Sequence, residues 1–138
     1  MRQVLRGIGE FDLVLVDYIQ LASPDDKHRN RYQEVDSIAY GCKAIAKEFD
    51  VPLMAAAQMS RAVEMRQNKR PVLSDLRESG GLEQAADAVL FLYPQEEKTN
   101  ITEVIVAKQR NGGTGSVELV YRAALTKFES AATHTPRY

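Results

Sequence analysis

The chain has 138 residues, a formal net charge of −1 and a pI of about 6.1. This length suits one soluble globular domain, and the near-neutral charge excludes a nucleic-acid binder that relies on a global basic field. The single cysteine, Cys42, cannot form an internal disulfide, and the apolar runs are too short to span a bilayer. The chain start lacks the apolar core of a signal peptide, so we expect a cytoplasmic protein with no membrane contact.

The first half of the chain predicts a strand, a helix and a second strand. Residues 11–17 are mostly large apolar or β-branched and end in Asp17, which favours a strand buried on both faces of a parallel sheet. Apolar residues at helical spacing predict a helix over 33–49. The sequence DVP at 50–52 ends this helix and precedes a strand over 53–57. This order predicts a right-handed parallel crossover.

The second half predicts short helices followed by strands. Ser74 is placed to cap a short helix, Gly80-Gly81 breaks it, and residues 82–87 predict another. Residues 101–108 and 116–121 are expected to form a hairpin. Two further strands are expected at residues 88–93 and 127–129. The fold class is therefore α/β, with a mostly parallel sheet, covering helices and antiparallel strands at the C-terminal edge. Residues 131–138 lack periodicity and are expected to be a disordered tail.

Two polar residues follow predicted strands, at the sheet edge where ligands bind in such folds. Asp17 ends the first strand, which is the Walker B arrangement that holds Mg²⁺ near nucleotide phosphates. Gln58 follows the next strand, and its amide can donate to a γ-phosphate oxygen and accept from a water. A turn-capping aspartate and an ordinary polar strand end are the alternative interpretations.

Residues 61–77 form a basic segment, with five cations against two carboxylates and a local net charge of +3. Beside a phosphate-sensing strand, such a segment is a candidate contact for a DNA backbone, although a solvated surface loop is the ordinary explanation. It contains no aromatic residue, so phosphate contacts are favoured over base stacking. Gly80 and Gly81 would let the backbone approach a phosphate closely.

Lys108 and Arg110 end a predicted edge strand, just before a glycine-rich turn. Their spacing of two places both cations on one face of an extended segment. Such a pair suits a phosphate on a neighbouring subunit, where an arginine finger stabilises the transferring phosphoryl group. Solubilising charge at a hairpin end is the alternative.

Four stretches in a fixed order carry a family resemblance: LVLVDYIQL, AAQMSR, SDLRESGGLEQAAD and KQRNGGTG. Over roughly residues 11–130 the chain resembles the RecA-like ATPase domain of the DnaB-type hexameric replicative DNA helicases. The resemblance implies that Asp17 binds Mg²⁺ and that Gln58 senses the γ-phosphate of ATP, both as catalytic residues. It implies that Lys108 and Arg110 bind the nucleotide of the adjacent subunit, with Arg110 as the catalytic finger.

The resemblance also implies a DNA-binding segment and a set of partners. Arg77, Glu78 and Gly80 would contact single-stranded DNA in the channel of a ring. The parent would be a homohexamer that couples ATP hydrolysis to 5′–3′ translocation and duplex unwinding, with a helicase loader and primase as candidate partners.

No GxxxxGK[ST] phosphate loop occurs in the 138 residues. We therefore expect residues 1–130 to be the C-terminal portion of a helicase ATPase domain that does not hydrolyse ATP alone. Two alternatives stay open: a non-catalytic stand-alone module that binds helicase subunits or DNA, and part of a RecA-like recombinase. The phosphate loop and its strand normally lie in the middle of such a sheet, so without them the strand over 11–17 would have unpaired edges and exposed faces. We therefore expect that the isolated chain self-associates, swaps elements or is a portion of something larger.

Overall fold

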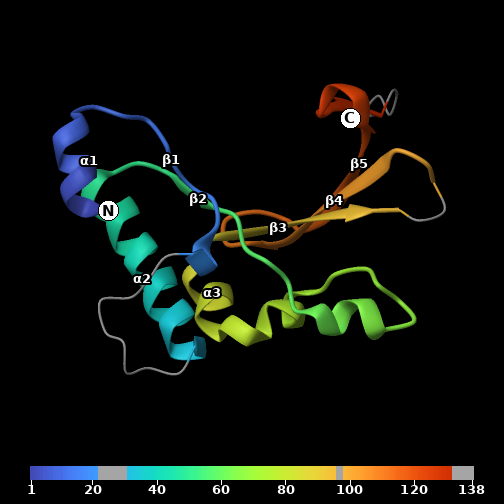
Figure 1. Ribbon diagram of the computed structural model, residues 1–138, viewed down its shortest axis with the longest axis horizontal. Coiled ribbons are helices and arrows are strands. Elements are labelled where there is room, and N and C mark those ends of the chain that lie inside the picture. The colour runs from blue at the N-terminus through green and yellow to red at the C-terminus, as the bar shows by residue number, and fades with distance from the viewer. Residues whose placement is uncertain (22–30, 96–97, 132–138) are drawn as a thin grey trace. The chain divides into compact units, whose positions relative to one another are not determined.

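A computed structural model describes residues 1–21, 31–95 and 98–131, without the side chains of residues 31–33 and 77–80. The chain divides into two compact units (Figure 1). The first unit comprises residues 1–67 and 74–86, and the second comprises residues 68–73 and those from Asp87 onward. Most of the predicted loop over 22–32, and all but the first residue of the predicted tail, lie outside the described residues.

The first unit is built on a pair of parallel strands. β1 (Val14–Val16) pairs with β2 (Leu53–Ala55), and α2 (Arg31–Phe49) lies between them in the sequence. The predicted parallel crossover is confirmed, although both strands are shorter than the apolar runs suggest. Backbone hydrogen bonds continue the pairing past the strand ends, since Ala56 N donates to Val16 O and Ile19 N donates to Ala56 O, both at 2.9 Å.

The core of this unit lies between α2 and the strand pair. Ile19, at the start of the 3-10 helix η1 (Ile19–Leu21), is only 1% exposed. Cys42 on α2 is buried, and this burial raises the pKa of its thiol. Two clusters of buried side chains form the core: Ile19, Ala39, Cys42 and Ala85, and separately Leu5, Val14 and Ile45.

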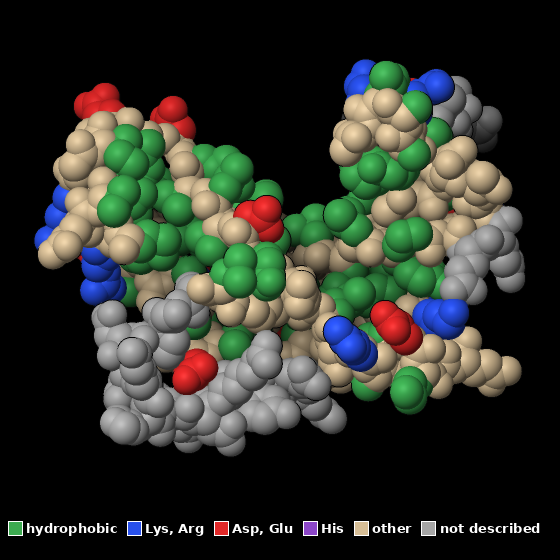
Figure 2. All heavy atoms as spheres, in the orientation of Figure 1, with side chains coloured by type: hydrophobic (Ala, Val, Ile, Leu, Met, Phe, Trp, Pro, Cys, Tyr) green, Lys and Arg blue, Asp and Glu red, His purple; other side chains and the backbone are tan. Residues whose placement is uncertain are grey.

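The other face of the strand pair is open. Leu15 and Met54 are register partners on adjacent strands, and they are 67% and 61% exposed. The prediction that the first strand is buried on both faces is therefore wrong for this chain, because α2 covers one face only. Figure 2 shows further hydrophobic side chains at the surface of both units.

Some helical segments, α1 (Arg2–Ile8) and η2 (Arg61–Met65) among them, are not predicted by the sequence pattern. α1 precedes β1, and ion pairs from Arg2 and Arg6 to Glu48 hold it to α2 at 3.2 and 2.6 Å. η2 is a 3-10 helix capped by the Ser60 hydroxyl, and such short helices are too brief to show a periodicity. None of the helices in the described part of the chain is long and apolar enough to cross a membrane.

The glycine pair opens a helix instead of breaking one. The 3-10 helix η3 (Leu73–Ser79) continues directly into α3 (Gly80–Ala85), so the predicted break is wrong. A close approach between helices explains the glycine, since a Cβ at Gly81 would lie 2.5 Å from Oδ1 of Asp36 on α2. Gly81 N donates to this same oxygen at 2.7 Å. Gly81 therefore permits the contact between α2 and α3.

The second unit is an antiparallel sheet whose strands pair in chain order. The predicted hairpin and last strand are confirmed, and the α/β class holds, with a parallel pair followed by antiparallel strands. Lys108 was expected on an edge strand, which is wrong, because its strand is flanked on both sides and Lys108 itself pairs with Val89. The elements are β3 (Ala88–Pro94), β4 (Ile101–Gln109), β5 (Gly115–Arg122), η4 (Ala123–Leu125) and β6 (Lys127–Ser130).

Candidate functional site

Asp17 and Gln58 lie beyond the carboxyl ends of β1 and β2. Asp17 directly follows β1, Gln58 lies three residues after the end of β2, and both are exposed. The peptide bond between Asp17 and Tyr18 is cis. Because the two strands are parallel neighbours, the two residues share the edge at which ligands bind in α/β folds. The placement predicted from the sequence is confirmed, and the roles of the two side chains stay predictions.

A single carboxylate at this edge is compatible with Mg²⁺. Among the described residues, no group of three or more His, Cys, Asp or Glu side chains could hold a metal by itself. Mg²⁺ usually keeps several waters and takes one or two protein carboxylates together with substrate phosphates. Asp17 fits this pattern, with the remaining ligands supplied by a nucleotide and water.

The backbone of Gln58 is held by Gln20, a residue that the sequence reasoning missed. Nε2 of Gln20 donates to Gln58 O at 3.1 Å, and its Oε1 accepts from Gln58 N at 3.3 Å. The contact uses only the backbone of Gln58, so the exposed side-chain amide keeps its donor and acceptor groups for a ligand. An amide residue three positions after Asp17 was the only signal in the sequence.

The segment after Gln58 is tied to η3 through Asp75. Ser60 N donates to Asp75 O at 3.3 Å. The Arg66 guanidinium donates to Oδ2 of Asp75 at 2.7 Å, and the Asp75 side chain is only 10% exposed. Since Asp75 lies two residues before Arg77, covalent bonds and hydrogen bonds connect Gln58 to the predicted DNA-binding segment.

The backbone of that segment is helical. Arg77 and Glu78 lie in η3, and Gly80 is the first residue of α3. Their side chains lie outside the described residues, so their contact with DNA stays a prediction.

The middle of the basic segment belongs to the second unit. Nε and Nη2 of Arg70 donate to the two carboxylate oxygens of Glu103 at 3.1 and 2.8 Å, and Glu103 is 9% exposed. The hydrogen bonds from Arg70 and then Ser116 lower the pKa of Glu103. Pro71 is almost fully buried. Because Arg66 and Arg70 are both paired with carboxylates, the basic field predicted for this segment is partly neutralised.

The second pair of predicted residues lies at the end of β4. Lys108 is half-buried within the strand, and Arg110 is exposed just beyond it. Arg110 N donates to Asp87 O at 2.8 Å, and Nη1 of Arg110 lies 3.0 Å from Oδ1 of Asp87. Sequence reasoning missed Asp87, which precedes β3.

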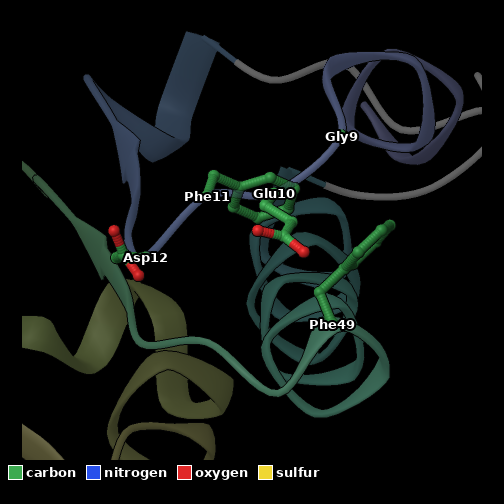
Figure 3. A pocket seen from close by; sticks show the side chains of 5 residues that line it. All are labelled: Gly9, Glu10, Phe11, Asp12 and Phe49. Atoms are coloured by element: carbon green, nitrogen blue, oxygen red, sulfur yellow. The ribbon is translucent and has the colours of Figure 1, made fainter.

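An open cavity of about 360 Å³ lies at the opposite end of β1 (Figure 3). The rings of Phe11 and Phe49 lie with their centroids 5.5 Å apart, and Figure 3 shows the Glu10 side chain beside them. The cavity is lined by residues 9–12, which precede β1, and by Phe49 at the end of α2, whereas Asp17 follows β1, so this cavity is not part of the candidate site.

Comparisons with known proteins identify the family of this chain. The family model described as "DnaB-like helicase C terminal domain" matches residues 1–130. The chain is 46% identical over 129 residues to the replicative DNA helicase DnaB of Geobacillus stearothermophilus, which covers 88% of this chain and 28% of that protein. It therefore spans less than a third of that relative's length.

Two solved structures resemble the chain closely. One is an ATPase domain with a TM-score of 0.86 and 42% identity, over 95% of this chain and 49% of its own. The other is a DnaB-like replicative helicase, described with its interactions with primase. It has the same TM-score and identity, over 95% of this chain and 33% of its own.

Proposed function

We propose that this chain works as part of a hexameric replicative DNA helicase, because it belongs to the DnaB-like helicase C-terminal domain family. The whole protein would couple ATP hydrolysis to 5′–3′ movement on single-stranded DNA and to duplex unwinding, in the cytoplasm. The observation that carries this proposal is the family match over residues 1–130, in which Asp17 and Gln58 share the ligand-binding edge of a parallel strand pair.

Asp17 would hold Mg²⁺ against the phosphates of ATP. When bound, the ion neutralises charge that develops on the transferring phosphoryl group. A carboxylate at the tip of a strand whose base is buried gives a fixed position, since Val14 is 7% exposed. This chain contains no phosphate loop, so we propose that it does not hydrolyse ATP unaided.

Gln58 would report whether the γ-phosphate is present. Its exposed amide can donate to a phosphate oxygen or orient a water, and its backbone is held by Gln20. Any shift of Gln58 would reach η3 through Ser60 and Asp75, whose backbones are hydrogen-bonded at 3.3 Å. We propose that this route ties nucleotide state to the grip on DNA by the segment with Arg77, Glu78 and Gly80.

Arg110 would act on the nucleotide of the adjacent subunit. A guanidinium at the exposed end of a strand presents two or more donors to a phosphate, and Lys108 adds charge from the same strand end. A helicase loader and primase remain proposed partners of the whole protein. The interactions with primase described for one similar helicase support the second of these.

A direct test uses the full-length protein that contains this chain. Asp17→Asn should reduce DNA-stimulated ATP hydrolysis and unwinding by at least about 100-fold, because the metal loses its protein carboxylate. Asp12→Asn is a matched control, since Asp12 is also exposed and lies just before the same strand. Retained unwinding in Asp17→Asn would contradict the proposal.

Two other functions are less favoured by the family match. A stand-alone module would bind DNA or helicase subunits without ATP hydrolysis. A recombinase would exchange strands without unwinding a duplex. Unwinding by the full-length protein, measured with a forked substrate, separates both from a helicase.

A further inference from the structure

The carboxylate of Asp87 holds the guanidinium of Arg110 within one unit of the chain. We propose that Asp87 is a positioning residue for Arg110. Its carboxylate keeps the guanidinium at the end of β4 until a nucleotide phosphate takes the place of the carboxylate. The inference rests on the proposed function, in which Arg110 reaches a nucleotide on the adjacent subunit. The ligand that competes with Asp87 is therefore the polyphosphate of that nucleotide.

Arg110 is attached to Asp87 at two points of different kinds. The register pairs Ala88 with Gln109, and the hydrogen bond from Arg110 N to Asp87 O at 2.8 Å extends this ladder by one step. The ion pair joins the two side chains at 3.0 Å. The backbone contact does not use the guanidinium. The side chain of Arg110 can therefore leave the carboxylate while the backbone of Arg110 stays fixed beside Asp87.

The ion pair is exposed enough to exchange. The side chains of Arg110 and Asp87 are 56% and 55% exposed, and ion pairs in water are weak. The Arg70–Glu103 pair of the same unit differs, since it has two hydrogen bonds and its carboxylate side chain is only 11% exposed. The Arg110–Asp87 pair is therefore suited to a reversible contact, and the Arg70–Glu103 pair to a structural one.

A phosphate is the better partner for the guanidinium once it arrives. It carries more charge than a carboxylate, and it accepts two parallel hydrogen bonds from arginine. Transfer of Arg110 from Asp87 to phosphate is therefore favourable, and Asp87 weakens nucleotide binding by the strength of the exposed pair. Asp87 also keeps the guanidinium beside its strand end when no nucleotide is bound.

The test measures nucleotide affinity in assembled full-length protein. Asp87→Asn keeps the size of the side chain and removes its charge. The Kd for the ATP analogue with an imido bridge between its β- and γ-phosphates should fall about two- to fivefold, the range expected for an exposed pair. The kcat for ATP should stay within about twofold of wild type, so the change appears as a lower KM.

Two further variants make the result specific. In an Arg110→Ala background, Asp87→Asn should leave the Kd unchanged, because no guanidinium remains to be released. Glu118→Gln is the matched control, since Glu118 lies on the same sheet and its pair with Lys98 is similarly exposed, at 42% for Glu118 and 55% for Lys98. This control should bind the analogue like wild type.

Three outcomes would overturn the inference: an unchanged Kd in Asp87→Asn, the same fall in the Arg110→Ala background, or an equal fall in Glu118→Gln. The failure of the proposed function is distinguishable. If Arg110→Ala alone retained wild-type ATP hydrolysis, the finger role itself would be wrong, and the role of Asp87 with it. If Arg110→Ala abolished hydrolysis and Asp87→Asn changed nothing, only the positioning role would be wrong.

Discussion

The side-chain amide of Gln20 forms two hydrogen bonds with the backbone of Gln58, although the residues are 38 positions apart. Gln20 lies beside Ile19, which is almost fully buried, so the clamp is built on a rigid part of the core. The proposed γ-phosphate sensor is therefore fixed by its backbone, while its side chain is exposed. Because the backbone of Gln58 is held in place, a small shift of Gln58 on ligand binding can be passed on to the segment that follows it.

Removal of the Gln20 clamp should weaken the link between nucleotide and DNA. Gln20→Leu deletes both hydrogen bonds, and we expect the stimulation of ATP hydrolysis by single-stranded DNA to fall several-fold in the full-length protein. Hydrolysis without DNA should change less. Gln84→Leu is the control, because Gln84 also accepts a side-chain hydrogen bond, from Tyr40 at 3.1 Å, but far along the sequence from Gln58. Equal stimulation in both variants would count against the clamp.

The sensor itself can be tested by Gln58→Ala in the same protein. The substitution leaves the backbone contacts with Gln20 possible and removes only the exposed amide. We expect DNA-stimulated hydrolysis to decrease about 10- to 100-fold, as for other groups that orient a water or phosphate. DNA-stimulated hydrolysis at the wild-type level would show that the proposed coupling through Gln58 is wrong.

Mixing experiments test whether Arg110 acts across a subunit interface. Arg110→Ala subunits added to wild-type rings should reduce ATP hydrolysis by more than their share, because each finger serves the neighbouring site. The measurement is the rate against the fraction of mutant subunits. A strictly proportional decrease would mean that Arg110 acts within its own subunit. Arg122→Ala, which removes another exposed and carboxylate-paired arginine of the same sheet, provides the control.

The contact between α2 and α3 predicts opposite effects for two glycine substitutions. Gly81→Ala places a Cβ against the Asp36 carboxylate and disrupts its hydrogen bond, and should lower the free energy of unfolding by about 1–3 kcal/mol. Gly41→Ala lies inside α2, where an added Cβ has nothing within 4 Å, and should raise it by about 0.5–1 kcal/mol. Denaturant unfolding of both variants checks the pair, and equal values would refute this account of Gly81.

The Arg70–Glu103 pair predicts a loss of stability in acid. Arg70 lowers the pKa of Glu103 below its ordinary value of 4.5. The stability that this group contributes is complete above that value, and it is lost as the pH falls through the lowered pKa. The difference in unfolding free energy between wild type and Glu103→Gln should therefore shrink below pH 4.5. In an Arg70→Ala background this pH dependence should be much smaller, and an unaltered profile would contradict the assignment.

The sequence by itself determined the local elements and the order of the chemical residues. Apolar runs and helical spacing located β1, α2 and β2, because burial on one face imposes a period that can be read directly. The strand order then placed Asp17 and Gln58 at one edge. The same reasoning missed α1 and η2, since a short helix held by ion pairs or by a single cap has too little apolar pattern.

Only the tertiary structure decided which polar groups meet. Gln20 forms hydrogen bonds with Gln58, and Asp75 forms an ion pair with Arg66. Asp87 forms an ion pair with Arg110. These contacts depend on the connections between elements and on strand register. Gly80 and Gly81, which suggest a break when read locally, open α3, because a carboxylate from another helix approaches the backbone of Gly81. A sequence pattern records which face of an element is buried, whereas the partner of an exposed charge or amide is fixed only when distant segments are brought within hydrogen-bond distance.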